Sequence, residues 1–275
     1  MDNMMQVTKK VRFIVLLFFA LLLTFLAVMA PVLAPHDPNK VNLPKKLHSP
    51  DRENLLGTDQ LGRDILSRIM YGARDSFAMT LFVVLITACI GTAIGIAAGF
   101  TGGAIDTVCM QIADVLLAFP SVVFVIAIIS VWGSGISNTL IAIAMISWAK
   151  YARISRGLSI EIRSYEYITM AILGGARWRR ILWRYLVPNI LPHIIIIATQ
   201  DVGETMITLS TLSFLGLVGK PSAPEWGNML ANSRAYIVTY PYVVLFPCLA
   251  ILVIIIIFSL LGDSLRDVLD PKDKR

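Results

Sequence analysis

Residues 77–100 read FAMTLFVVLITACIGTAIGIAAGF, a run of 24 residues without a charged side chain. A helix needs roughly 20 mostly apolar residues to cross a hydrocarbon core about 30 Å thick. Gly91, Gly95 and Gly99 recur every four residues in this run, so they share one side of the predicted helix and would let a second helix approach closely. The stretch therefore predicts a membrane span with a tight helix contact. Whether that contact lies within this chain or with another subunit stays open.

Further apolar stretches extend this reading to the whole chain of 275 residues, of which 56% are hydrophobic and only 15% charged. Five more stretches are apolar enough to be considered as spans, at 11–34, 108–132, 136–149, 190–217 and 243–262. Pro120 predicts a kink in the third span, and the fourth is short. The expected fold is an all-α integral membrane protein with about six spanning helices.

Basic side chains predict the orientation, because Lys and Arg are enriched in cytoplasmic loops. The densest group is Lys150, Arg153, Arg156, Arg163, Arg177, Arg179, Arg180 and Arg184, opposed nearby only by Glu161 and Glu166. We therefore expect loop 150–189 to be cytoplasmic, together with the start of region 1–34 and the tail 263–275. Segment 35–75 and loop 218–241 would then be extracytoplasmic, although the seven Lys and Arg residues of 35–75 oppose this orientation.

Within that cytoplasmic loop, residues 166–189 read EYITMAILGGARWRRILWRYLVPN. Apolar or small side chains recur at three-to-four spacing, which predicts one face of a short amphipathic helix. That face comprises Ile162, Tyr165, Ile168, Thr169 and Ile172. The small residues Ala171, Gly174, Gly175 and Ala176 predict its end. Such a helix could transmit a partner's motion to the adjoining spans, or it could lie on anionic lipid as an interfacial helix.

The loop resembles that of the permeases of ABC importers, whose pattern is Glu-Ala-Ala, three residues, Gly, nine residues, Ile, one residue and Leu-Pro. Ala171, Gly175 and Pro188 match this pattern, whereas Thr169, Met170, Tyr185 and Val187 depart from it. Glu166-Tyr167 resembles a pair that precedes the pattern in the peptide and nickel branch. The blocks 56–64, 213–217, 224–230 and 262–271 extend the resemblance over most of the chain, to the C-type permease of dipeptide, oligopeptide and nickel importers.

This resemblance implies a membrane complex of several subunits. The expected partners are a second, similar permease, two cytoplasmic ATPases, an extracytoplasmic solute-binding protein and membrane lipid, in the inner or plasma membrane. The resemblance assigns ATPase coupling to Glu166, Tyr167, Ala171, Gly174, Gly175, Ala176 and Pro188. ATP and Mg²⁺ would bind to the partner ATPases, with no cofactor or catalytic residue in this chain. Peptides, nickel and metal chelates all remain open as solutes.

Polar residues in the fifth predicted span indicate a second site. Asp201 and Glu204 stand three residues apart and share a helix face with Thr208. Ionisable groups at membrane depth usually face a bundle interior or a water-filled path. We expect this face to border the translocation path and to favour a cationic or amine-bearing solute. The alternative is that both acids pair with basic residues of a partner subunit. Asp114, in the third span, is expected to be a structural pairing residue.

Other function classes fit the sequence less well. The excess of six positive charges lacks the aromatic-interleaved patch of a nucleic-acid-binding domain, and the three histidines are too scattered to predict a metal site. A membrane enzyme would need a cluster of catalytic residues that the sequence does not show. A secondary transporter driven by an ion gradient remains the main alternative, although we find no convincing internal repeat of the kind such folds use.

Overall fold

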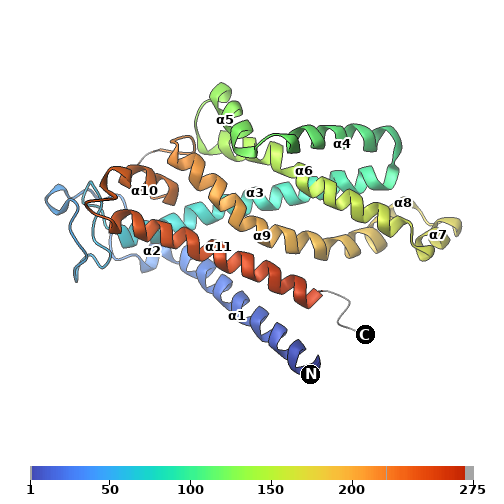
Figure 1. Ribbon diagram of the computed structural model, residues 1–275, viewed down its shortest axis with the longest axis horizontal. Coiled ribbons are helices and arrows are strands. Elements are labelled where there is room, and N and C mark those ends of the chain that lie inside the picture. Colours follow the sequence, from blue (N-terminus) through green and yellow to red (C-terminus); the bar gives the residue numbers. More distant parts are fainter. Residues whose placement is uncertain (1, 221, 270–275) are drawn as a thin grey trace.

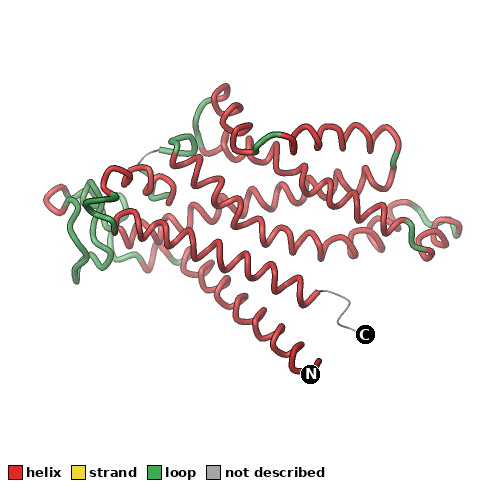
Figure 2. The backbone as a smooth tube through the Cα atoms, in the orientation of Figure 1, coloured by secondary structure: helices red, strands yellow, loops and turns green. Residues whose placement is uncertain are grey.

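The computed structural model describes residues 2–220 and 222–269, with the backbone alone for residues 2–7. Residues 270–275 of the predicted tail lie outside the described residues. All regular elements of the described part are helical, which confirms the all-α prediction (Figure 2). In chain order they are α1 (Asp2–Val28), α2 (Ala30–Leu33), η1 (Leu43–Lys45), α3 (Ile65–Thr101), α4 (Gly103–Ala118), α5 (Ser121–Trp132), α6 (Ile136–Arg163), α7 (Glu166–Leu173), α8 (Trp178–Ile181), η2 (Leu182–Leu186), α9 (Val187–Phe214), α10 (Trp226–Ser233), η3 (Arg234–Tyr236) and α11 (Tyr242–Leu269).

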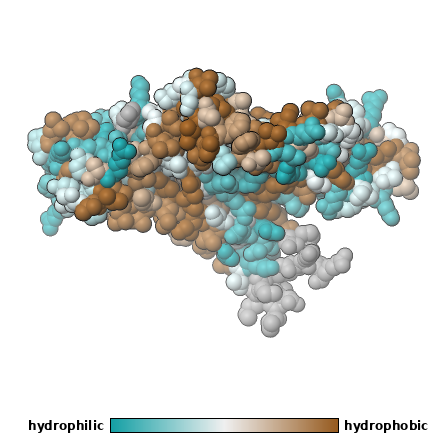
Figure 3. Space-filling view, turned by 45° about the horizontal axis from the view of Figure 1, so that its top comes forward, coloured by the Kyte–Doolittle hydropathy of each residue, from teal (hydrophilic) through white to brown (hydrophobic). Residues whose placement is uncertain are grey.

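The long helices run along one elongated bundle (Figure 1). One end holds residues 35–64 and α10, which we call the loop end. At the opposite end α7 and α8 project beyond the long helices, and we call this the α7 end. The chain start at α1 and the last turn of α11 both point toward the α7 end. On the face seen in Figure 3, hydrophobic side chains cover much of the middle and hydrophilic ones gather mainly toward the two ends, as expected for a protein that crosses a bilayer.

The contact between α3 and α6 is the most extensive helix pairing in the bundle. Gly91, Gly95 and Gly99 lie against α6 of the same chain, at Trp148, Ala152 and Arg156 in turn. A Cβ atom on Gly95 would stand 2.2 Å from the carbonyl oxygen of Ala152, which is impossible without moving a helix. The glycine stripe therefore packs two helices of this chain together, which was left open by the sequence.

The structure corrects two of the predicted spans. Stretch 108–132 is not one kinked helix, because α4 and α5 meet at Phe119 and Pro120 with a bend of 95°. Stretch 136–149 does not end at Ala149, since α6 continues as an unbroken helix to Arg163. Four helices of the described residues are long and apolar enough to span a membrane, or five if the bent pair counts as one. The fourth predicted span corresponds to α6, which does not meet that criterion.

Candidate functional site

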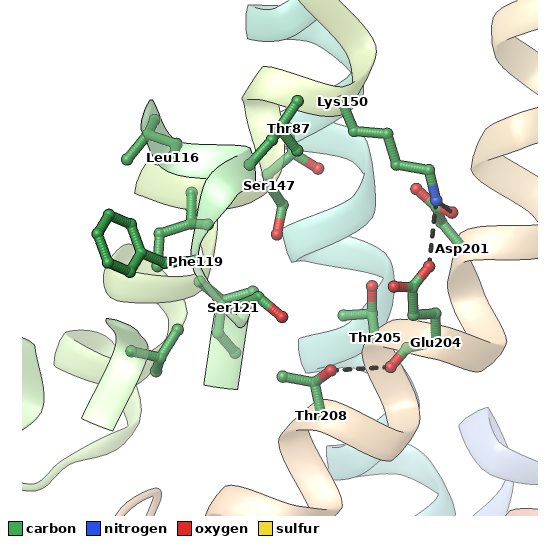
Figure 4. Close-up of a pocket in the computed structure, with 14 residues that line it drawn as sticks. Thr87, Leu116, Phe119, Ser121, Ser147, Lys150, Asp201, Glu204, Thr205 and Thr208 are labelled. Carbon is green, nitrogen blue, oxygen red and sulfur yellow. Dashed lines mark hydrogen bonds and ion pairs between the residues drawn. The ribbon is translucent and has the colours of Figure 1, made fainter. Parts of the chain in front are cut away.

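A cavity of about 240 Å³ lies among the α4–α5 bend, α6 and α9. Its wall is apolar near the bend and polar near α9. The lining residues are Thr87, Leu116, Leu117, Phe119, Ser121, Val125, Ile143, Ile146, Ser147, Lys150, Asp201, Glu204, Thr205 and Thr208. Figure 4 shows Lys150 reaching from α6 toward Asp201 and Glu204 on α9, with Phe119 and Ser121 on the other side. The cavity thus collects the predicted pathway residues of α9 and adds a cation from α6.

Lys150 holds both acids of this cavity. Its Nζ lies 2.6 Å from Asp201 Oδ1 and 3.1 Å from Glu204 Oε2. The two carboxylates differ in environment, since the Asp201 side chain is 12% exposed and that of Glu204 is 71% exposed. Thr208 also lines the cavity, and its hydroxyl donates to the carbonyl oxygen of Glu204 at 3.0 Å. Two carboxylates share one ammonium group, so the formal net charge of the three side chains is −1.

This pairing changes the sequence interpretation of the acids and of the basic loop. Asp201 and Glu204 pair with Lys150 of their own chain, whereas the sequence alternative placed their counter-ions on a partner subunit. Lys150 is also not a loop residue, because it lies within α6. The spacing of the two acids on α9 could be predicted, but their contact with Lys150 depends on how α6 packs against α9.

Two further arginines of the predicted loop attach α4 to α6. Arg156 donates two hydrogen bonds to the carboxylate of Asp106, at 2.7 and 2.6 Å. Arg153 forms an ion pair with Asp114, as expected for a structural pairing residue. These contacts fix the helix that leads into the bend at the cavity wall. Neither pair could be predicted from the sequence, because the arginines and their acids lie far apart along the chain.

The predicted coupling helix is α7, which projects at the α7 end (Figure 1). It begins at Glu166 and ends at Leu173, followed by Gly174 and by Gly175 in the left-handed conformation at φ +74°. The amide of Ala176 donates to the carbonyl of Ala171, which closes the turn. The remaining predicted coupling residues flank this turn. Glu166 and Tyr167 lie exposed in the first turn of α7, and Pro188 lies exposed in the first turn of α9.

The five residues predicted to share one face of a short helix do not lie on one helix, because Ile162 belongs to α6 and Tyr165 precedes α7. Ile162 and Ile168 are buried, but Tyr165, Thr169 and Ile172 are exposed. Ile168 packs with Ile181 and Ile190 in an apolar cluster that joins α7 to the start of α9. Met170 and Leu173, which the periodicity did not single out, are 70% and 77% exposed. α7 is therefore anchored by Ile168 and presents an uncovered apolar surface to its surroundings.

At the loop end, a buried charge cluster joins distant parts of the chain. Asp59 Oδ2 accepts a hydrogen bond from Arg63 Nε at 2.7 Å and lies 3.6 Å from Arg68 Nε. Arg68 is 1% exposed and also donates to the carbonyl oxygens of Pro38 and Ala223, both at 3.0 Å. This cluster lies in sequence block 56–64 and its continuation into α3. In the sequence this block stands out only by resemblance, because its charge pairing depends on the fold.

Glu225 caps α10 in the same region. Its carboxylate accepts from the amides of Gly227 and Asn228, at 3.0 and 2.9 Å, and from the hydroxyl of Ser213 on α9. Burial nevertheless raises the pKa of Glu225 above its ordinary value, because these hydrogen bonds only partly offset the loss of water. Glu225 of block 224–230 thus hydrogen-bonds α10 to α9, and the loop end is held in place by buried polar contacts.

Metal binding finds no support in the described residues, where no group of three His, Cys, Asp or Glu side chains is arranged to hold an ion. The charged cavity has two carboxylates, but Lys150 occupies the space between them and a resident cation would have to displace it. The cavity therefore offers two carboxylates and one ammonium group for polar contacts.

Comparison with known proteins gives one matching family model over residues 91–275, described as binding-protein-dependent transport system inner membrane component. Three relatives align along nearly the whole chain. The glutathione transport system permease protein of Pectobacterium atrosepticum is 41% identical, over 93% of this chain and 85% of its own. The nickel transport system permease protein of Escherichia coli K12 is 38% identical, over 91% and 90%. The dipeptide transport system permease protein of Haemophilus influenzae is 36% identical, over 94% and 90%.

A solved structure supports the fold independently. A chain from the MetNI methionine ABC transporter, in an inward-facing conformation, superimposes with a TM-score of 0.58 at 17% sequence identity. The match covers 75% of this chain and 98% of that chain. At this identity the likeness establishes a shared fold for the helical bundle.

Proposed function

This chain belongs to the family of inner membrane components of binding-protein-dependent transport systems and is a permease subunit of an ABC importer, and we propose that α7 couples it to separate ATPase subunits. The family assignment replaces the alternative of an ion-gradient-driven secondary transporter. The observation that carries the proposal is the projecting α7, with Met170 and Leu173 uncovered at its surface. Exposed apolar surface is typical of a contact with another protein or with a membrane, and we propose a protein contact here because α7 projects beyond the long helices (Figure 1).

The mechanism follows from how α7 is anchored. Ile168 belongs to the same apolar cluster as Ile162 at the end of α6 and Ile190 near the start of α9. A force applied to α7 is therefore transmitted to the two helices that carry Lys150 and the paired acids. In this proposal, ATP-driven movement of the partner shifts α6 relative to α9 and changes the access to the cavity between them.

The charges that line the cavity favour a cationic or amine-bearing solute. Two carboxylates share one lysine, and Glu204 is the more exposed of them, so an ammonium group or a metal cation would be attracted there. Nickel is a cation, and dipeptides and glutathione each contain an amine, which is consistent with the names of the three relatives. We propose that this chain lines half of a path for a peptide, a nickel ion or a metal chelate.

The remaining parts of the proposal concern assembly and orientation. A second permease would complete the path, two ATPases would bind ATP and Mg²⁺, and a solute-binding protein would dock at the loop end. The sequence contains no Gly-x-x-x-x-Gly-Lys-Ser/Thr phosphate loop, which supports placing ATP hydrolysis in the partners. We place α7 and both termini in the cytoplasm. This is consistent with the start of α1 and the end of α11 pointing toward the α7 end (Figure 1).

Co-purification tests the coupling role. The tagged chain, isolated from its native membranes in mild detergent, should carry ATPase subunits that mass spectrometry identifies. We expect M170D/L173D to lose them, because two carboxylates would be buried in the contact. Val238→Asp is the matched control, since Val238 is 90% exposed in the loop-end region after α10. Retention of the ATPases by M170D/L173D, or their absence from the unaltered chain, would contradict the proposal.

A further inference from the structure

The segment directly after α7 carries a surface that the coupling role does not use. In α8 and η2, Ile181 and Leu186 are buried in the apolar cluster that also holds Ile168. The opposite side is exposed and consists of Trp178, Arg179, Arg180, Trp183 and Arg184, which we call the Arg/Trp face. Trp178 and Trp183 are 58% and 69% exposed. The guanidinium carbon of Arg179 lies 5.5 Å from the centre of the Trp178 ring.

The charge of this face is uncompensated. Residues 167–200 contain no Asp or Glu, and no ion pair is found for Arg179, Arg180 or Arg184 within the described parts of the chain. This differs from the arginines on α6, since Arg153 and Arg156 both pair with acids on α4. Three arginines that share a surface with no acid repel one another, so the face is suited to an anionic partner.

Its position relative to the membrane identifies that partner. Residues Trp178–Phe214 form one of the helices that are long and apolar enough to span a bilayer, and the Arg/Trp face makes up its first turns. Tryptophan is enriched at the depth of lipid headgroups, and arginine binds phosphate oxygens through paired N–H groups. We propose that the Arg/Trp face is a binding site for anionic phospholipid headgroups in the leaflet next to α7. This proposal rests on the orientation given under the proposed function.

The alternative occupant is the ATPase that α7 is proposed to contact. A protein surface that buried three arginines would need matched acids in fixed positions, because unpaired buried charges are strongly unfavourable. A headgroup layer supplies mobile phosphates instead. The exposed apolar surface of α7 at Met170 and Leu173 is uncharged, which suits a protein contact. The two neighbouring surfaces therefore divide the roles, with the ATPase at α7 and the lipid at the Arg/Trp face.

The test uses the intact complex in nanodiscs of phosphatidylcholine alone or of phosphatidylcholine mixed with phosphatidylglycerol. Native mass spectrometry measures retained phosphatidylglycerol, and thermal unfolding measures the stabilisation that this lipid gives. In R179Q/R180Q/R184Q we expect retention to fall by on the order of tenfold, and the stabilisation to be lost, because each arginine near an anionic surface contributes to binding. The ATPases should remain bound. The control R52Q/R74Q/R234Q removes three exposed arginines outside the α7 end and should behave as the unaltered chain.

Each outcome decides the proposal. Unchanged retention of phosphatidylglycerol in R179Q/R180Q/R184Q would overturn it, and so would an equal loss in the control variant. Loss of the ATPases from R179Q/R180Q/R184Q would also overturn it, because the face would then be a protein contact. If the unaltered chain carries no ATPase, the coupling proposal fails, while the lipid measurement can still be read by itself.

Discussion

The Nζ atom of Lys150 lies 2.6 Å from Asp201 Oδ1 and joins α6 to α9 at the wall of the charged cavity. Asp201 is the more buried of the two acids that this lysine contacts, so it depends most on the pairing. The single lysine is shared by two carboxylates, of which Glu204 is the more exposed. We therefore expect Asp201 to matter more for stability and Glu204 more for solute contact.

Removing Lys150 should destabilise the bundle. We expect Lys150→Met to lower the free energy of unfolding by about 1–3 kcal/mol, less than for a fully buried pair because the Lys150 side chain is 41% exposed. K150M/D201N should recover part of this loss, since it removes the unpaired carboxylate. Unfolding of the purified chain and its variants, arranged as a double-mutant cycle, measures the coupling. Lys46→Met, at an exposed position, is the control. Strictly additive single effects would argue against the pair.

Replacing Glu204 should affect transport more than stability. We expect Glu204→Gln to reduce uptake of the solute carried by the binding protein by on the order of tenfold, because a charge-assisted contact with a cationic group is lost. Glu204→Asp retains the charge and should retain most of the uptake. Uptake is measured in cells whose membranes contain the assembled complex in equal amount. Uptake that does not change in Glu204→Gln would remove this acid from the path.

The packing of α3 on α6 predicts opposite effects for two glycines. Gly95→Ala should destabilise the chain by about 1–3 kcal/mol or more, because its Cβ would meet the carbonyl of Ala152 at 2.2 Å. Gly157→Ala should stabilise α6 by up to about 1 kcal/mol, since no atom lies within 4 Å of the added Cβ and alanine favours helix. Thermal unfolding of both variants checks this. Similar shifts in the same direction would show that the α3–α6 contact is looser than described.

Glu225 predicts a pH dependence of the loop end. Because its pKa is raised by burial, the folded chain holds this proton more tightly than the unfolded chain. The resulting stability is fully present below the carboxyl pKa of the unfolded chain and is lost as pH rises through the raised pKa of the folded chain. We expect the melting temperature of the unaltered chain, minus that of Glu225→Gln, to fall as pH rises from about 4 to about 8. The same difference taken with Glu53→Gln, an exposed acid, should not show this fall. A difference that rises with pH would contradict the burial argument.

The features that the sequence predicted are those that depend on local pattern. The run 77–100 lies within α3, as predicted. An apolar stretch of that length predicts a helical span without any knowledge of distant contacts. The four-residue spacing of Gly91, Gly95 and Gly99 likewise indicated a contact face, although not its partner. The end of α7 at Gly174 and Gly175 was also readable, since a left-handed residue after a helix favours glycine.

Features that depend on contacts between helices far apart in sequence could not be predicted. The sequence predicts loop charges at Lys150, Arg153 and Arg156 because their acidic partners lie far away along the chain, on α4 and α9. The 95° bend after α4 could not be predicted from Pro120 alone, because a proline within a span can produce a mild kink or a complete break. The exposure of Met170 and Leu173 could not be predicted either, because residue spacing within α7 does not show which side of the helix packs on α6 and α9.

The most direct test of the coupling role is a cross-link from α7 in the intact complex. A photoreactive amino acid in place of Met170, which is 70% exposed, should form a covalent adduct with an ATPase subunit on illumination. The same amino acid in place of Val238 should give no such adduct. An ATPase adduct from position 238 and none from position 170 would place the ATPases at the loop end, and it would contradict both the orientation and the coupling role of α7.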